Sequence, residues 1–296
     1  MITADPWQGS DGNQLLVIIS VAYHSHSALK NLAKDLANQK GSQFDWLIVN
    51  NAPLSAPLDA EQLPLANYPI QIINGQEGDG FSRGCNRAFE VLKAQGFKGW
   101  VWLLNPDTNL RRGDECARMI YQLTQVDKCT VLGTAVMAAD GKLEASGGWL
   151  DPGLQFRRRR VGEKLIKKEK TVVVDWVSGC SLVLQPTAHQ PEARFDQSFI
   201  LYYEDFDLCL RLKAQGAEVL WWPELIINHQ KGAGSKTPSA RRLKLSTISY
   251  LRFIKRYCPL WVQLLRIGRV FFNAVLRFPL QPKSSLSVLS ALWEHL

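Results

Sequence analysis

Three carboxylates gather in one short, mostly apolar stretch of the chain. Glu204, Asp205 and Asp207 stand within residues 199–211, whose other members are chiefly Phe, Leu, Ile and Tyr. Ionised carboxylates are costly to bury unless a ligand or a charge partner compensates them, and neighbouring carboxylates repel one another. We therefore expect a binding or catalytic site here, with one carboxyl group whose pKa is raised.

Two further polar residues end apolar segments that have the composition of strands. His229 ends a segment that begins at Trp221, and Asp107 ends another that begins at Trp100. Carboxylate and imidazole groups are common ligands of metal ions. Together with the acidic stretch, these strand ends offer oxygen and nitrogen ligands to a bound molecule.

The order of the segments predicts an α/β fold. Short runs rich in β-branched residues alternate with amphipathic stretches, which is typical of a mostly parallel sheet covered by helices on both faces. We expect strands at residues 15–22, 46–49, 70–73, 100–104 and 130–137, with helices at 28–39, 83–94 and 112–125. Such sheets bind ligands at the carboxyl ends of their strands, where this chain has Asn50, Asn74, Asn105 and Asp107.

The following part of the chain has a different pattern. Glycine-rich turns lead into a strongly basic segment, residues 157–170. A run of like charges is typical of a solvated loop or hairpin. We expect strands at 172–177 and 181–184 after it, then a helix from Tyr203 and a strand that ends at His229.

The composition indicates a globular protein with a full hydrophobic core. Of the 296 residues, 46% are hydrophobic, enough for one large α/β domain with or without an appendage. The six cysteines form no CxxC pair, which argues against a zinc knuckle or a disulfide framework and for a reducing compartment. No apolar run approaches the roughly 20 residues that cross a bilayer, and the first run is too short for a signal peptide. We expect a cytoplasmic protein.

The net charge of +8 is concentrated at the C-terminal end. From residue 236 onward, eleven Lys and Arg side chains stand against one acid, Glu294, so the preceding part is nearly neutral. We expect a flexible N-terminus at residues 1–13, a globular domain at 14–235 and a basic helical tail at 236–296. A positive tail on a neutral domain favours contact with an anionic surface over a nucleic-acid-binding core.

The tail from Pro259 has the pattern of a helix with one polar stripe. Arg266, Arg269, Asn273 and Arg277 recur at spacings of three and four, and most other positions are apolar. Such a helix either packs on the domain or lies in a membrane interface with its arginines toward anionic headgroups. The basic residues upstream favour the membrane, which would make the protein peripheral on the inner face of the plasma membrane. Removal of residues 259–296 is then expected to abolish binding to anionic vesicles.

Four blocks of sequence follow one another along the chain: residues 17–23, 49–52, 80–88 with 103–108, and 176–179 with 195–208. Taken in this order, they resemble the inverting glycosyltransferases of family 2, which have the GT-A fold. The pattern is most similar to that of the rhamnosyltransferases. The resemblance implies transfer of a sugar from a dTDP- or UDP-linked donor to a saccharide or lipid-linked acceptor in cell-surface polysaccharide synthesis. Rhamnose is favoured, and other hexosyl or galactofuranosyl donors stay open. The absence of a QxxRW motif favours a non-processive enzyme.

The resemblance also implies roles for the polar residues above. Asp107 and His229 would bind Mg²⁺ or Mn²⁺, which neutralises charge on the leaving diphosphate. Asp205 would be the general base that takes the proton of the acceptor hydroxyl and so inverts the anomeric centre, with Glu204 as the alternative base. Asp207 is expected to pair with Arg211 one helical turn later.

By the same resemblance, a further set of residues binds the nucleotide. These are Tyr23, Asn50, Gly80, Arg83, Asn86 and Asn105. Arg83 is expected near the diphosphate, Asn86 to shape its turn, and the glycine-rich residues 231–235 to fold over the phosphates. The family usually has Asn at position 24 and Asp at position 50, where this chain has His24 and Asn50. The identity of the nucleobase in the donor therefore stays open.

Two interpretations from other classes remain. The first is a catalytically idle relative that binds a nucleotide sugar and serves as a scaffold at the membrane. The second is a basic polyanion-binding protein whose acidic cluster is structural, which predicts salt-sensitive nucleic-acid binding and no metal-dependent nucleotide binding.

Overall fold

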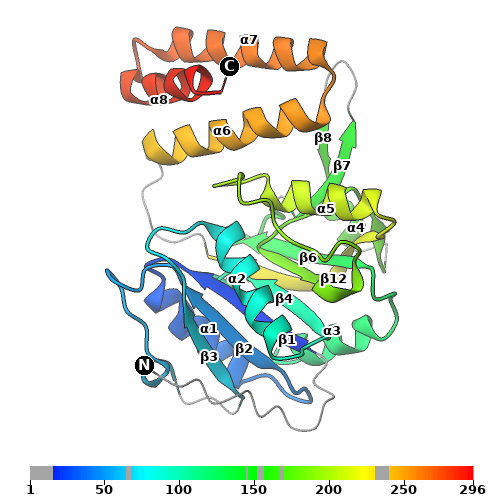
Figure 1. Cartoon of the computed structure of the whole chain (residues 1–296). Helices are drawn as coiled ribbons and strands as arrows, with labels where there is room; N and C mark the ends of the chain where they lie inside the picture. The colour runs from blue at the N-terminus through cyan, green and yellow to red at the C-terminus, as the bar shows by residue number, and fades with distance from the viewer. Residues whose placement is uncertain are drawn as a thin grey trace.

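A large mixed sheet with helices on both faces forms the body of the molecule (Figure 1). The computed structural model describes residues 16–64, 68–144, 146–151, 157–166, 170–230 and 240–295. The strand order of the 9-stranded sheet is β3-β2-β1-β4-β11-β6-β12-β5, and β9 pairs with β12 beside this path. The predicted α/β class, with a mostly parallel sheet between helices, is confirmed.

The N-terminal half of the sheet is parallel throughout. It consists of β1 (Leu16–Ala22), β2 (Asp45–Asn50), β3 (Ile70–Asn74) and β4 (Trp100–Leu104). The other half contains β6 (Val131–Ala138) and β12 (Val219–His229), which are parallel to each other. Between β4 and β6 lies β11 (Ser181–Leu184), antiparallel to both. The short β5 (Thr108–Asn109) and β9 (Val172–Val173) pair antiparallel with β12.

The helices divide between the two faces of the sheet. On one face lie α1 (His26–Ala37) and α3 (Glu115–Leu123), and on the other lie α2 (Phe81–Ala94) and α5 (Glu204–Ala214). Successive residues of β1 alternate between two cores, with Val17 and Ile19 in the core of α2 and α5, and Leu16 and Ile18 in the core of α1 and α3. Since both faces are buried, the strands read as continuous apolar runs.

A second, 3-stranded sheet contains β10 (Trp176–Val177), β7 (Gly147–Asp151) and β8 (Arg157–Arg160), and the short α4 (Glu163–Ile166) follows it. The basic segment therefore begins as the second strand of a hairpin. The predicted single strand at residues 172–177 is wrong in one respect. It is split into β9 and β10, which belong to different sheets, and the Asp175 carboxylate between them accepts the backbone N–H of Leu150 at 2.8 Å.

Three helices form the C-terminal part and lie beyond α5 (Figure 1). They are α6 (Ala240–Tyr257), α7 (Leu260–Arg277) and α8 (Pro282–Trp293). Within the part of the chain that the structure describes, no helix combines the length and the apolar character that crossing a membrane requires.

A buried carboxylate joins these helices to α5. The side chain of Asp207 is fully buried and binds Arg211 Nε at 2.7 Å, so the predicted Asp207–Arg211 pair is confirmed. The same carboxylate also accepts hydrogen bonds from Arg256 Nη1 at 2.5 Å and from the Tyr257 hydroxyl at 2.7 Å. Arg256 in turn binds Asp196 at 2.7 Å. Arg211, Arg256 and Tyr257 together satisfy both carboxylate oxygens of Asp207, and this offsets the cost of burying its charge.

Candidate active site

A cavity of about 800 Å³ lies between the carboxyl-end rim of the sheet, the start of α5 and the C-terminal helices. Asn105 and His229 line it from the sheet, Glu204 and Asp205 from α5, and residues of α6, α7 and α8 from the opposite side. The cavity is large enough for a drug-sized ligand. Of the strand-end and helix-start residues predicted from the sequence, the cavity thus brings together Asn105, His229, Glu204 and Asp205.

Asp107 and His229 are neighbours at this rim because their strands pair. His229 at the end of β12 lies opposite Thr108 of β5, one residue after Asp107. His229 Nε2 is 3.1 Å from Asp107 Oδ1. Asp107 itself does not line the cavity, but its side chain is 30% exposed and touches the histidine that does.

Glu144 hydrogen-bonds to the other ring nitrogen of His229. Its Oε2 is 3.1 Å from His229 Nδ1. Burial alone would lower the pKa of His229, but the hydrogen bonds and charges of Asp107 and Glu144 outweigh it and raise that pKa. Sequence reasoning missed Glu144, because the sequence around it contains no recognisable motif. Leu143 bridges Met137 of β6, and β6 pairs with β12, so the topology alone brings Glu144 to the histidine.

The arrangement fits a divalent metal ion held partly by the protein. A metal-bound histidine typically hydrogen-bonds a carboxylate through its other ring nitrogen, as His229 does with Glu144. Among the described residues, no group of three or more His, Cys, Asp and Glu side chains is arranged to hold a metal. Asp107 and His229 would therefore coordinate the metal from the protein. The remaining coordination positions would go to oxygen atoms of a bound molecule and to water, as is usual for Mg²⁺.

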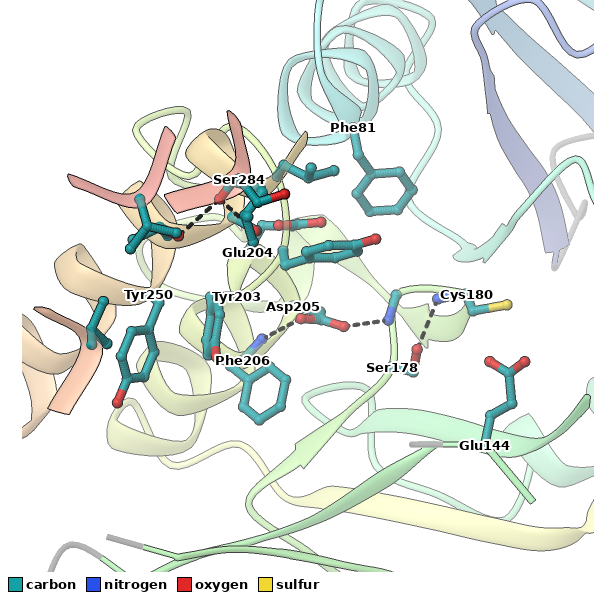
Figure 2. A pocket seen from close by; sticks show the side chains of 18 of the residues that line it. Phe81, Glu144, Ser178, Cys180, Tyr203, Glu204, Asp205, Phe206, Tyr250 and Ser284 are labelled. Atoms are coloured by element: carbon teal, nitrogen blue, oxygen red, sulfur yellow. Dashed lines mark hydrogen bonds between the residues drawn. The ribbon is translucent and has the colours of Figure 1, made fainter. Parts of the chain in front are cut away.

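Asp205 lies in the cavity wall with its carboxylate fixed by backbone donors (Figure 2). Gly179 N–H donates to Oδ2 and Phe206 N–H donates to Oδ1, both at 2.9 Å. A Cβ at position 179 would lie 3.2 Å from the Phe81 ring, which is a tight contact, and 3.5 Å from Asp205 Cβ, which is an ordinary one. Two charge-assisted hydrogen bonds favour the ionised form of a carboxylate.

Glu204, the preceding residue, has the opposite environment. It is buried, and its Oε2 has no hydrogen-bond partner among the described residues. Burial, followed by the charge of Asp205, raises the pKa of Glu204 from 4.5 to about 8. At neutral pH the chain therefore presents a neutral carboxylic acid beside Asp205, as the three-carboxylate pattern leads us to expect.

The raised pKa of Glu204 gives a pH dependence of stability. As pH rises from the ordinary carboxyl range toward about 8, the unfolded chain releases a proton that folded Glu204 keeps, so the free energy of unfolding falls. Above that pH, and below pH 4.5, this contribution no longer varies. A Glu204→Gln variant should lack it, and thermal unfolding of both proteins across this range measures the difference. If the melting temperatures of the two proteins changed with pH in the same way, the raised pKa of Glu204 would be contradicted.

The two residues immediately before Glu204 and Asp205 have an unusual backbone conformation. Tyr202 and Tyr203 have φ angles of 65° and 69°, in the left-handed region that bulky residues rarely adopt. Each such residue costs about 1–3 kcal/mol and persists only where the surroundings impose it. The Tyr203 ring packs 5.1 Å from the Phe253 ring of α6 and 5.6 Å from Phe206. This packing fixes the sharp turn after which Asp205 meets the cavity.

Of the residues predicted to bind the nucleotide, only Asn105 lines this cavity. Tyr23 is 52% exposed at the end of β1, and Arg83 is an exposed partner of Asp79 at 3.2 Å. Tyr23 directly follows β1, and Arg83 lies in the first turn of α2. Neither residue lines the cavity, so their nucleotide role stays a prediction.

The other predicted nucleotide residues hold local structure. Asn50 bonds the backbone of Ala56 and Ala52 at 2.9 and 3.0 Å, and buried Asn86 bonds both backbone groups of Phe195 at 2.9 Å. Gly80 is the N-cap residue of α2, and a Cβ there would lie 2.8 Å from the Ile200 carbonyl oxygen. These contacts shape the rim, and the roles of the three residues toward a nucleotide also stay predictions. The segment 231–235 lies outside the described residues.

Comparison with known proteins relates the chain to solved structures alone. No protein-family model matches it, and no curated protein matches its sequence. GalNAc-T7, crystallised with UDP, GalNAc and Mn²⁺, is similar with a TM-score of 0.54 and 13% identity over 84% of this chain. The mannosyltransferase PcManGT from Pyrobaculum calidifontis, in complex with GDP-Man and Mn²⁺, has a TM-score of 0.54 and 10% identity, with 99% of this chain and 90% of that chain covered.

A third similar structure is residues 1–349 of TarS from S. aureus in complex with UDP. Its TM-score is 0.50 at 10% identity, with 94% of this chain and 90% of that chain covered. The chain spans about half of GalNAc-T7, 52% of its length. At identities this low the likeness establishes architecture, and the similar structures are glycosyltransferases of the GT-A type. The chain has the GT-A glycosyltransferase fold.

Proposed function

We propose that the protein is a metal-dependent, inverting, non-processive glycosyltransferase of the family 2, rhamnosyltransferase-like kind. It transfers a sugar, with rhamnose favoured, from a dTDP- or UDP-linked donor to a saccharide or lipid-linked acceptor in cell-surface polysaccharide synthesis. The observation that carries the proposal is one cavity with the Asp107-bound His229 at one part of its wall and Asp205 at another. The Mn²⁺ and nucleotides named for GalNAc-T7 and PcManGT support it.

Asp107 and His229 would hold a divalent cation, which neutralises negative charge on the diphosphate as it leaves. Glu144 orients His229 through Nδ1 and leaves Nε2 facing Asp107. Asn105 lines the cavity beside them and can hydrogen-bond the ribose or a water molecule.

Asp205 acts as the general base of the transfer. The acceptor oxygen bonds to the anomeric carbon, the bond from that carbon to the diphosphate breaks, and the hydroxyl proton passes to Asp205. Attack from the face opposite the leaving group inverts the anomeric centre. The backbone donors of Gly179 and Phe206 hold the carboxylate in place for this step.

Thermal-shift measurements with nucleoside diphosphates, with and without Mn²⁺, test the proposal. We expect a pyrimidine diphosphate to raise the melting temperature of the wild type when Mn²⁺ is present. Asp107→Ala should abolish the Mn²⁺-dependent part of the shift, and Glu144→Gln should weaken the apparent metal affinity about 10- to 100-fold. Asp140→Ala is the matched control, because Asp140 is a 57% exposed carboxylate paired with Lys142. Equal Mn²⁺ dependence in Asp107→Ala and wild type would overturn the metal assignment.

A further inference from the structure

Helix α7 turns a broad apolar surface toward solvent. Six large side chains on it, which we call the apolar arc, are between 44% and 75% exposed: Trp261, Leu264, Leu265, Phe272, Val275 and Leu276. With 3.6 residues per turn, these positions share about 120° of the helix circumference. Contiguous exposed apolar surface of this kind marks an interaction site.

The opposite side of α7 faces the body of the protein. Val262 and Ala274 are buried, while Asn273 and Arg277 line the cavity that also contains Asp205. A surface helix of a globular protein ordinarily directs its wider apolar face to the core and its polar face to water. In α7 the widest apolar face points outward, and two residues of the polar stripe point to the cavity.

The apolar surface continues past the end of α7. Phe278 and Leu280 in the connection to α8 are 42% and 85% exposed, and Leu286 on α8 is 56% exposed. Figure 1 shows α7 and α8 as the outermost elements of the C-terminal part, with α6 between α7 and the sheet domain. The exposed apolar residues therefore belong to the end of the molecule farthest from the sheet.

The surrounding charge indicates what covers this surface. Within the described residues 240–295, Glu294 is the one acid, and Lys244 neutralises it at 2.5 Å. Exposed Arg269 borders the apolar arc on α7, and exposed Lys283 stands at the start of α8. No described residue forms an ion pair with either cation. A second copy of the chain would bring like charge to like charge, whereas an anionic bilayer supplies both apolar depth and opposite charge.

We propose that α7 lies in the interface of an anionic membrane with the apolar arc inserted among the lipids. The helix lies flat, because no described helix is long and apolar enough to span a bilayer. Arg269 then sits at the level of the anionic headgroups. The same helix separates the lipid from the cavity, and this places the Asn273 and Arg277 side of the cavity close to the membrane surface. Where the proposed transferase function holds, that position suits an acceptor saccharide carried on a lipid.

Vesicle co-sedimentation of the full chain tests the proposal. We expect the wild type to bind vesicles of phosphatidylcholine with phosphatidylglycerol, and to bind vesicles of phosphatidylcholine alone much more weakly. The double variant Phe272→Glu with Leu276→Glu should lower partitioning about 100-fold, since two apolar side chains lose their burial. The matched control is Leu54→Glu with Tyr121→Glu, because these residues are 83% and 69% exposed outside the C-terminal helices. It should bind as the wild type does.

Other outcomes overturn the proposal and are separate from the function of the cavity. Equal vesicle binding by wild type and double variant would exclude the apolar arc as the contact. Light scattering that showed a wild-type dimer, converted to a monomer by the double variant, with no vesicle binding by either, would assign the arc to a second copy. The Mn²⁺-dependent diphosphate shift should be the same in the wild type and the double variant. If the wild type showed no such shift, the proposed transferase function would be rejected, and the vesicle-binding result would still hold.

Discussion

Asp205→Asn is expected to lower turnover about 10²- to 10⁴-fold, the usual contribution of a general base. The amide is nearly isosteric with the carboxylate but accepts no proton from the sugar hydroxyl. It also turns an N–H₂ group toward one of the two backbone donors, Gly179 or Phe206, so a small loss of stability should accompany the loss of rate. Steady-state transfer assays combined with diphosphate binding would show the rate reduced and donor affinity retained.

Glu204→Gln is the matched control for this experiment. Because Glu204 is already neutral at neutral pH, the amide copies its charge and shape, and turnover should fall by less than about tenfold. The reverse pattern, with turnover lost in Glu204→Gln and kept in Asp205→Asn, would make Glu204 the base. A wild type that binds donor and metal but transfers no sugar to any acceptor would instead favour the idle scaffold.

Asp207→Ala is expected to reduce the free energy of unfolding by about 3–5 kcal/mol, the range for removing one partner of a buried ion pair. The change leaves Arg211, Arg256 and the Tyr257 hydroxyl without their shared acceptor. Denaturant unfolding measures the loss. Limited proteolysis should also show the C-terminal helices cut more readily, because Asp207 joins α5 to α6.

Asp196→Ala tests whether the effect depends on burial. Asp196 binds the same Arg256, but its side chain is 27% exposed, so its removal should cost about 1 kcal/mol or less. Similar losses for the two variants would show that the buried network contributes no more than a surface ion pair.

The runs of apolar residues and the spacing of charged residues predicted those parts of the structure that depend on residues close together in the sequence. The apolar runs gave β1, β4 and β11 nearly to the residue, and the spacing of four gave the Asp207–Arg211 pair. The second and third partners of Asp207, Arg256 and Tyr257, lie in another helix. No local rule connects residues 49 or 50 positions apart.

The candidate site required more than local pattern. Asp107 and His229 are 122 positions apart, and a resemblance rather than any spacing paired them. Glu144 had no signal at all, because it reaches His229 only through the pairing of β6 with β12. The polar stripe of α7 was visible in the sequence, but which face meets the cavity depends on how α6 and α8 pack beside it.

The position of the C-terminal helices has a practical consequence for shortened versions of the protein. Residues of α6, α7 and α8 close one side of the cavity that Asp205 lines. A truncation before Ala240 would open that side to bulk solvent. Under the proposed transferase function, water would then compete with the sugar hydroxyl for the activated donor, and such a fragment would hydrolyse its donor instead of extending a glycan.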